Sequence, residues 1–339
     1  MQQAQYFEEA DHANKTVRCV LCPHKCVIPP DSVGACRVRK NRQGRLFSLV
    51  YNEAVSVNVD PIEKKPLYHF YPGSSILSLG TLGCSFRCSF CQNWEISQAE
   101  YGQISSRDID PKLALKLAKQ YNSIGIAYTY NEPLVNYEWV KETAALFKAN
   151  GLKNILVTNG YINPKPWEEL LEYIDAANID VKSFNEDFYR KYCGAKLKPV
   201  LESVEMMVKK GVHVELTNLI IPNCNDSMDE IESLVAWIGG LDREIPLHFS
   251  RYYPQYRLKE PATGMETLVK AYDTAKKKLD YVYVGNVQDD KLNSTFCPGC
   301  GNLLIKRAGF SIEITGLKDG CCSKCRKKIK IKFREGKDA

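Results

Sequence analysis

Short apolar runs alternate with longer amphipathic stretches through the middle of the chain, from about residue 61 to residue 290. The short runs have the length and composition of buried strands. The longer stretches repeat apolar residues every three or four positions, as Leu113, Leu117 and Tyr121 do, and this period predicts helices. The predicted strands cover residues 76–82, 124–130, 154–158, 177–181, 212–220, 246–249 and 281–284.

This alternation predicts an α/β fold built on a parallel sheet, because each strand is followed by a helical crossover. The spacing leaves open whether the sheet is doubly wound or curled into a barrel. In both arrangements ligands bind at the carboxyl ends of the strands. The residues that end the predicted strands are therefore the candidates for a functional site.

Two regions that contain cysteine pairs flank this core. We expect a Cys-rich metal-binding region over residues 1–60, the core over residues 61–290 and a third region over residues 291–339. Apolar and polar residues alternate over residues 46–59, as in a half-exposed strand or hairpin. A polar loop over residues 61–71 is predicted to link the first region to the core.

Composition narrows the cellular setting. The chain has 339 residues, 44% of them hydrophobic, which is enough for a sizeable core. Its 14 cysteines come without a secretory leader or an apolar run long enough to span a membrane. We therefore expect a cytoplasmic protein without membrane contact, in which cysteines bind metal instead of forming disulfides.

The net charge of +6 is concentrated at the end of the chain. Residues 323–339 carry the whole surplus, and the remainder is neutral. A basic patch of this kind could bind nucleic acid or an acidic partner. The solvated face of a small domain is the favoured interpretation, so nucleic-acid binding is not expected.

The most informative residues are Cys84, Cys88 and Cys91, which follow one another at intervals of four and three positions. A structural zinc site needs four protein ligands. Three thiolates on a cubane iron–sulfur cluster leave one iron without a protein ligand, and that iron can bind a substrate. Buried cysteines, or part of a zinc site, are the alternative interpretation.

The loop resembles the CxxxCxxC motif of the radical S-adenosylmethionine (SAM) superfamily, including the aromatic Phe90 before the last cysteine. Further segments resemble the branch related to glycyl-radical-enzyme activases, and within it the radical SAM protein of the AmmeMemoRadiSam system. The resemblance covers nearly the whole chain. Its motifs are the Cys-x2-Cys-Pro-x2-Cys segment at 19–26, the segments 61–67, 91–93 and 130–133, and the closing cysteine pairs.

The resemblance implies a partial (β/α)6 TIM-like barrel with the cluster loop after its first strand. It also implies a catalytic [4Fe-4S] cluster held by Cys84, Cys88 and Cys91, with SAM on the fourth iron. Reductive cleavage of SAM would give a 5'-deoxyadenosyl radical that abstracts hydrogen from a substrate. An oxidoreductase of this kind needs an electron-donor protein, and its substrate is a small molecule or a partner protein.

Two strand ends supply candidates for binding SAM. Asn131 and Glu132 match in part a Gly-Gly-Glu segment that holds the SAM amino group in the superfamily. Alternatively, Asn131 caps the N-terminus of a helix, where the negative charge of Glu132 interacts favourably with the helix dipole. Thr158 and Asn159 end the next strand, where small polar residues can contact a ribose.

Two further strand ends supply the remaining candidates. Asp180 and Lys182 lie on the same face of a strand, so Lys182 either binds the SAM carboxylate or forms a salt bridge with Asp180. His248 is either a proton donor or a core histidine, and the second interpretation is slightly favoured.

The flanking cysteines indicate further metal sites. Cys297, Cys300, Cys322 and Cys325 match the two knuckles of a zinc ribbon, with Cys321 as an alternative to Cys322 and a rubredoxin-type iron as the competing metal. A region this small is expected to need its metal in order to fold.

The N-terminal set is looser and consists of Cys19, Cys22, Cys26 and Cys36. Zinc is favoured over an auxiliary cluster and over unliganded cysteines, since the activases that carry auxiliary clusters usually place those cysteines after the SAM loop.

Two classes of function remain. The first is a radical SAM enzyme that acts on a small molecule or activates a partner at a glycine. The second is a non-catalytic metal protein, either an electron carrier or a nucleic-acid binder that uses its basic ribbon. The three-cysteine loop favours the first class, because carriers and ribbons coordinate their metals fully.

Overall fold

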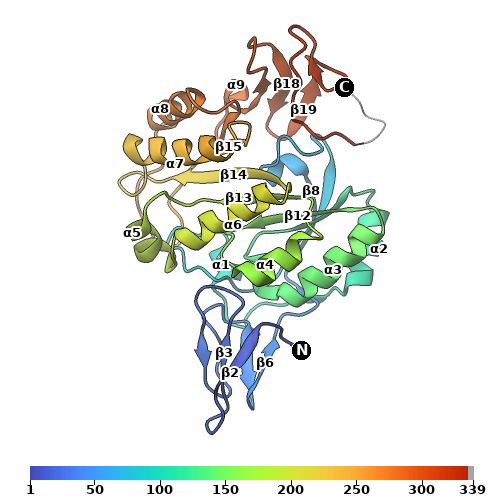
Figure 1. Cartoon of the computed structure of the whole chain (residues 1–339), viewed down its shortest axis with the longest axis vertical. Coiled ribbons are helices and arrows are strands. Elements are labelled where there is room, and N and C mark those ends of the chain that lie inside the picture. The colour runs from blue at the N-terminus through green and yellow to red at the C-terminus, as the bar shows by residue number, and fades with distance from the viewer. Residues whose placement is uncertain (335–339) are drawn as a thin grey trace.

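The computed structural model describes residues 1–334, and a sheet of eight strands forms its centre (Figure 1). The strands from β9 to β16 are parallel, and β8 pairs antiparallel with β9 at one edge. In their order across the sheet, the strands are β8 (Ser56–Pro61), β9 (Ser75–Gly80), β11 (Gly125–Tyr128), β12 (Lys153–Thr158), β13 (Ala176–Asp180), β14 (His213–Ile220), β15 (Leu247–Arg251) and β16 (Val282–Gly285).

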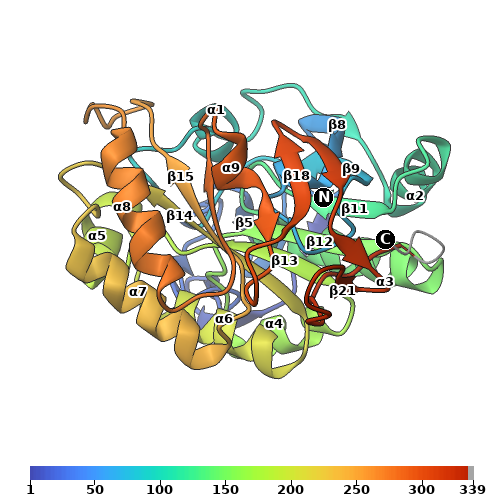
Figure 2. The same cartoon turned by 90° about the horizontal axis from the view of Figure 1, so that it is seen from above.

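The predicted α/β partial barrel is confirmed, and each predicted strand matches an observed one to within two residues at either end. The barrel is open because β8 and β16 are the two edges of the sheet. Seven strands are parallel, one more than a (β/α)6 unit has. Helices line the outer face of the sheet (Figure 2): α2 (Pro111–Gln120), α3 (Tyr137–Ala149), α4 (Pro164–Leu171), α6 (Lys198–Lys209), α7 (Met228–Leu241) and α8 (Met265–Lys276).

Two small sheets form an N-terminal module below the barrel in Figure 1. One contains β2 (Phe7–Asp11), β3 (Thr16–Cys19) and β4 (Val27–Ile28), and the other β1 (Gln2–Gln3), β6 (Arg45–Ser48) and β5 (Arg39–Arg42). The module packs beside the loop after β12, where Asn163 donates hydrogen bonds to the carbonyl oxygens of Val20 and Leu21. It therefore covers carboxyl ends of the parallel strands. A further two-stranded pair joins β7 (Glu53–Ala54) to β10 (Arg107–Asp108).

The prediction of a polar linker over residues 61–71 is wrong. This segment contains a short helix, η1 (Ile62–Lys64), and buries Leu67 and Phe70. Lys65 is only 1% exposed, and its ammonium group lies 2.6 Å from the Asp60 carboxylate. The ion pair lets a charged sequence lie in the interior. Since β8 crosses the predicted boundary at residue 60, the first region and the core share a strand.

The C-terminal region packs against the opposite end of the barrel. It comprises α9 (Asp290–Asn293), β17 (Thr295–Phe296), β18 (Leu303–Ala308), β19 (Ser311–Ile314), β20 (Leu317–Lys318) and β21 (Cys321–Cys322). Its buried Arg307 lies 4.2 Å from the ring centroid of Tyr68 and donates a 2.8 Å hydrogen bond to the Tyr68 carbonyl oxygen. Tyr68 belongs to an apolar cluster that also contains Tyr283, in β16, and Tyr281, just before it.

Acidic residues of the barrel face part of the basic segment. Lys330 lies 2.7 Å from Asp242 and 3.1 Å from Glu244, and Lys327 lies 3.8 Å from Asp280. These contacts neutralise some of the surplus charge, in agreement with a solvated face. Residues 335–339 of the segment lie outside the described residues. No helix in residues 1–334 is long and apolar enough to cross a membrane.

A buried bidentate ion pair joins the N-terminal module to α3. The Arg39 guanidinium donates hydrogen bonds of 3.1 and 3.0 Å to the two Glu138 oxygens, and these side chains are 2% and 4% exposed. We predict that Glu138→Ala lowers the free energy of unfolding by about 3–5 kcal/mol, because it leaves a buried charge unpaired. Urea unfolding followed by circular dichroism measures this loss.

The matched control is Glu266→Ala, which removes an exposed partner of Lys270 and is expected to change little. Equal effects of the two substitutions would contradict the structural role of the Arg39–Glu138 pair.

Candidate active site

The predicted cluster loop follows β9 and spans the carboxyl ends of the sheet. Backbone hydrogen bonds fix it: Arg87 N donates to Cys193 O at 2.8 Å, and Ser89 N donates to Tyr192 O at 3.0 Å. Both acceptors belong to η3 (Tyr189–Cys193), which follows β13. Ser89 O in turn accepts hydrogen bonds from the amides of residues 257–258, beyond β15. The loop is thus held between distant connections of the barrel.

Cys84, Cys88 and Cys91 lie on this loop, with Cys88 buried and the other two half-buried. Their sulfur atoms do not all lie within 4.8 Å of one another; within residues 1–334 only the C-terminal cysteines meet that criterion. In a cubane cluster each thiolate binds a different iron, so the three sulfurs need not lie within reach of a single ion. The buried hydroxyls of Thr81 and Ser89 have no hydrogen-bond partner, which also fits a site for a further group.

The loop thiols are shielded from water. Burial raises the pKa of Cys84, and the contact with Cys193, together with burial, raises the pKa of Cys88. Without metal these thiols stay protonated at neutral pH. Metal binding must therefore displace protons, which couples occupancy of the site to pH.

Two asparagines from neighbouring strand ends support the start of the loop. Asn131, after β11, accepts a 3.0 Å hydrogen bond from Thr81 N and donates a 2.7 Å bond to Gly83 O. Asn159, after β12, donates to the Ser85 hydroxyl at 3.1 Å and to Cys84 Sγ at 3.7 Å. The sequence predicted both residues as contacts of SAM. In the structure their side-chain amides instead form hydrogen bonds with the loop.

Glu132 is fully buried between the same strand ends. One carboxylate oxygen accepts hydrogen bonds from Thr158 Oγ1 at 2.7 Å and Leu134 N at 3.0 Å, and the other accepts from Asn159 N at 2.8 Å. The bond from Leu134 caps η2 (Pro133–Asn136), so Glu132 is the cap residue and Asn131 is not. Burial raises the pKa of Glu132 to about 7, although these hydrogen bonds oppose the shift.

Asp180 and Lys182 form an ion pair, with 2.7 Å between ammonium and carboxylate, which was one of the two interpretations of these residues. Burial lowers the pKa of Lys182, but the charge of Asp180 and its hydrogen bond oppose this shift, and the pKa is raised. Lys182 is therefore a permanent cation next to the cluster loop. Phe90 is buried nearby and packs against Phe188, with 5.7 Å between ring centroids.

His248 lies away from these residues. Its Nε2 is 2.7 Å from a Glu215 oxygen, and His213, the first residue of β14, contacts the other oxygen at 3.0 Å. The amides of Tyr68 and His69 also donate to Glu215, so this network belongs to the amino end of the sheet. We withdraw His248 from the cofactor candidates and assign it to the core. Charged residues alternating with apolar ones at the start of β14 were the only sequence signal of this network.

Sequence reasoning also missed the role of Tyr130. Its backbone is left-handed, with φ of 74°, a conformation that glycine adopts without strain. Its carbonyl oxygen accepts a 2.7 Å hydrogen bond from Asn93, and its hydroxyl bonds to Asp60. In the superfamily motif a glycine stands at the matching position. This difference was the sequence signal that could have indicated the left-handed backbone of Tyr130.

The C-terminal cysteines converge on one point. The sulfur atoms of Cys297, Cys300, Cys322 and Cys325 all lie within 4.8 Å of one another, with 3.5 Å between Cys297 and Cys325 and 3.6 Å between Cys300 and Cys322. Cys322 belongs to this group and Cys321 does not. The arrangement suits a single tetrahedral ion.

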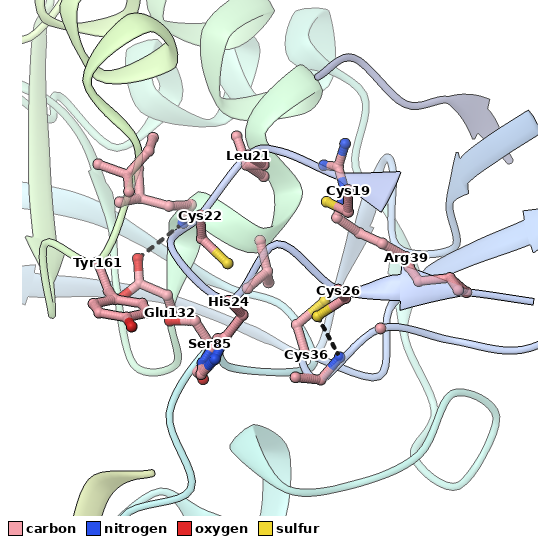
Figure 3. A pocket seen from close by; sticks show the side chains of 16 residues that line it. Cys19, Leu21, Cys22, His24, Cys26, Cys36, Arg39, Ser85, Glu132 and Tyr161 are labelled. Carbon is pink, nitrogen blue, oxygen red and sulfur yellow. Dashed lines mark hydrogen bonds between the residues drawn. The ribbon is translucent and has the colours of Figure 1, made fainter. Parts of the chain in front are cut away.

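The N-terminal cysteines surround a cavity instead. Cys19, Cys22, Cys26 and Cys36 all line it, and so do Ser85 and Glu132 from the barrel (Figure 3). The ring of His24 contacts the Ser85 carbonyl oxygen at 2.7 Å, which joins the cavity wall to the cluster loop.

Comparisons with known proteins agree with this geometry. Residues 79–238 match the model of the radical SAM superfamily. An uncharacterized protein of Methanocaldococcus jannaschii is 44% identical, over 98% of this chain and 99% of its own length. The pyruvate formate-lyase-activating enzyme of Clostridium pasteurianum is 26% identical, over 47% of this chain and 67% of its own.

A solved radical SAM methyltransferase from Sphaerobacter thermophilus shares the fold, with a TM-score of 0.50 and 15% identity over 63% of this chain and 67% of its own. The fold and the cluster loop thus define a radical SAM protein. The chain belongs to the radical SAM superfamily.

A contact between Gly83 and Cys36 sets the spacing between loop and module. A Cβ atom at Gly83 would lie 2.6 Å from Cys36 O, and φ there is +85°. Gly102 has a similar φ of +92° but open space around it. We predict that Gly102→Ala costs only the left-handed strain of about 1–2 kcal/mol, whereas Gly83→Ala also displaces the loop and lowers iron uptake.

Thermal unfolding and iron analysis after anaerobic reconstitution measure the two effects. If both variants take up as much iron as the wild type, the Gly83–Cys36 contact does not position the loop.

The raised pKa of Glu132 predicts a pH dependence of stability. Between its ordinary value of 4.5 and about 7, the folded protein holds a proton that the unfolded chain releases. The contribution of Glu132 to stability is therefore present at low pH and lost as the pH rises through about 7. We expect the thermal midpoint to fall less between pH about 5 and about 8 in Glu132→Gln than in the wild type.

The exposed Glu172→Gln serves as the control and should keep the wild-type slope. An unchanged slope in Glu132→Gln would show that Glu132 titrates normally.

Proposed function

We propose that the protein is a radical SAM enzyme that reductively cleaves SAM and uses the resulting 5'-deoxyadenosyl radical to abstract hydrogen from a substrate. The observation that carries this proposal is the loop of Cys84, Cys88 and Cys91, which backbone hydrogen bonds hold across the carboxyl ends of the barrel. A [4Fe-4S] cluster bound there supplies the electron and the open iron for SAM.

The chain's own residues hold and orient these groups. Cys84, Cys88 and Cys91 bind the cluster. Lys182, fixed by Asp180, offers a cation beside Cys88 that matches the carboxylate of SAM. Phe90 packs under the loop and excludes water from it.

The residues after β11 and β12 take a positioning role in this proposal. Asn131 and Asn159 hold the loop, and Glu132 joins both strand ends through Thr158. One oxygen of Glu132 accepts a single hydrogen bond from the protein. It therefore keeps a lone pair for an ammonium group such as that of SAM.

The C-terminal site has a different task. Its four sulfurs suit a structural zinc ion, and it lies against the amino ends of the strands, away from the cluster loop. We propose that this zinc stabilises the region that covers Tyr68 and Tyr283.

The names of relatives support a second candidate for the substrate. The Clostridium pasteurianum relative and a 22% identical Escherichia coli relative are both named as pyruvate formate-lyase activating enzymes. A partner enzyme that is activated by hydrogen abstraction from a glycine is therefore the second candidate, next to a small-molecule substrate. In either case a low-potential electron-donor protein is required.

We predict that the anaerobically reconstituted and reduced protein releases 5'-deoxyadenosine from SAM, as measured by chromatography. Cys88→Ala should lose this activity by at least about 100-fold, because the cluster loses one of its three thiolates. Cys224→Ala removes a cysteine outside every cysteine group described above and should retain activity. No 5'-deoxyadenosine from the iron-loaded wild type would overturn the proposal.

Substitution of Cys193 tests whether one iron lacks a protein ligand, because Cys193 is buried in contact with Cys88. Cys193→Ala should keep the wild-type iron content, since the proposal assigns it no iron. A loss of iron in this variant would identify Cys193 as a fourth ligand and remove the site for SAM.

A further inference from the structure

We propose that Cys19, Cys22, Cys26 and Cys36 hold a second iron–sulfur cluster, in place of the zinc ion that the sequence favoured. The inference concerns a site apart from the three-cysteine loop, and it goes beyond the proposed function. It rests on the spacing of the sulfur atoms, on the cavity between them and on an unpartnered donor in the cavity wall.

The spacing of cysteine sulfurs distinguishes the two kinds of site. Zn–S bonds of about 2.3 Å place the sulfurs of a tetrahedral site about 3.8 Å apart. The C-terminal set meets this requirement, with separations of 3.5 and 3.6 Å. A cubane cluster spreads its thiolates further, because each binds its own iron. The two arrangements therefore leave different spacings in one and the same chain.

The N-terminal set has the wider spacing. Among the described residues, no three of its cysteines, with or without His24, have ligand atoms that all lie within 4.8 Å of one another. Cys84, Cys88 and Cys91 share this property. Yet all four N-terminal cysteines line one cavity (Figure 3). The four sulfurs thus face one space without meeting the spacing that the C-terminal set shows.

The wall of the cavity has the chemistry of a cluster site. Leu21, Ile28 and Val135 are buried apolar residues that keep water from it. The backbone amide of Ala35 donates a 3.3 Å hydrogen bond to Cys26 Sγ, and hydrogen bonds to sulfur tune the potentials of iron–sulfur clusters.

A buried donor in the same wall lacks a partner. Arg39 lines the cavity and lies beside Cys19 in Figure 3. Its terminal nitrogens bond to Glu138 and Gln5, but its buried Nε has no acceptor. Buried N–H groups in native structures almost always have one. A cluster with sulfide and thiolate acceptors would supply it.

The cavity adjoins the first cluster loop. Cys36 O packs against Gly83, and His24 contacts Ser85, so the N-terminal set touches the loop on both sides of Cys84. A second cluster at this place would accept one electron from a low-potential donor protein and pass one electron to the loop cluster. No bond or proton changes place in that transfer. Zinc, which has no redox chemistry, would be inert here.

The test is metal analysis of the full chain after anaerobic loading with iron, sulfide and zinc. The wild type should hold about eight irons and one zinc. The triple variant C84A/C88A/C91A should keep about half of the iron and a cubane spectrum in Mössbauer spectroscopy. Cys22→Ser/Cys26→Ser should lose the other half but keep the zinc of the C-terminal site, which also reports that the chain is folded.

Cys224→Ala is the matched control and should keep all of the iron. A triple variant without iron but with about two zinc ions would overturn the inference, as would a triple variant with neither metal at the N-terminal cysteines. If the wild type fails to cleave SAM while the triple variant holds its cluster, the proposed function fails and this inference stands.

Discussion

The site depends on the hydrogen bonds that hold one short loop to the ends of three strands. Three thiolates can share a cluster only if residues 84–91 keep one shape, and this loop has no regular secondary structure of its own. Asn131 fixes its start, and the backbone of η3 fixes its middle. Glu132 keeps the supporting strand ends in register although it is buried, because three donors share its charge. Rigid support of this kind is what a catalytic centre requires.

The candidate site and the buried Glu215 network lie at opposite ends of the barrel. The cysteine loop and the N-terminal cavity lie at the carboxyl ends, where the connections vary and polar groups gather. At the amino ends, Glu215 accepts hydrogen bonds from two histidines and two backbone amides beneath the C-terminal region. Burial raises the pKa of Glu215, but its hydrogen bonds to the histidines outweigh this effect and lower it well below the ordinary value. The carboxylate thus stays ionised and joins the segment of Tyr68 to β14 and β15.

Most of the fold and the key cysteines could be predicted from the sequence, since both follow from local patterns. The apolar runs predicted the strands, and the spacing of the cysteines between Cys84 and Cys91 predicted the cluster loop. Contacts between side chains could not be predicted. The segment 61–71 was predicted as a polar loop because the burial of Lys65 depends on its ion pair with Asp60, and the roles of Asn131 and His248 depended on which neighbours their side chains contact. Cys321 and Cys322 differ only in the direction of their side chains, which a sequence does not specify.

The contact of Gly83 with the Cys36 carbonyl oxygen brings two cysteine sites into one thermodynamic system. Each backbone limits where the other can lie. If both sites hold the clusters that we propose, binding at one site therefore lowers the conformational cost of ordering the other. By reciprocity, the second cluster then strengthens the binding of the first by the same factor, and assembly of the two proposed centres is cooperative.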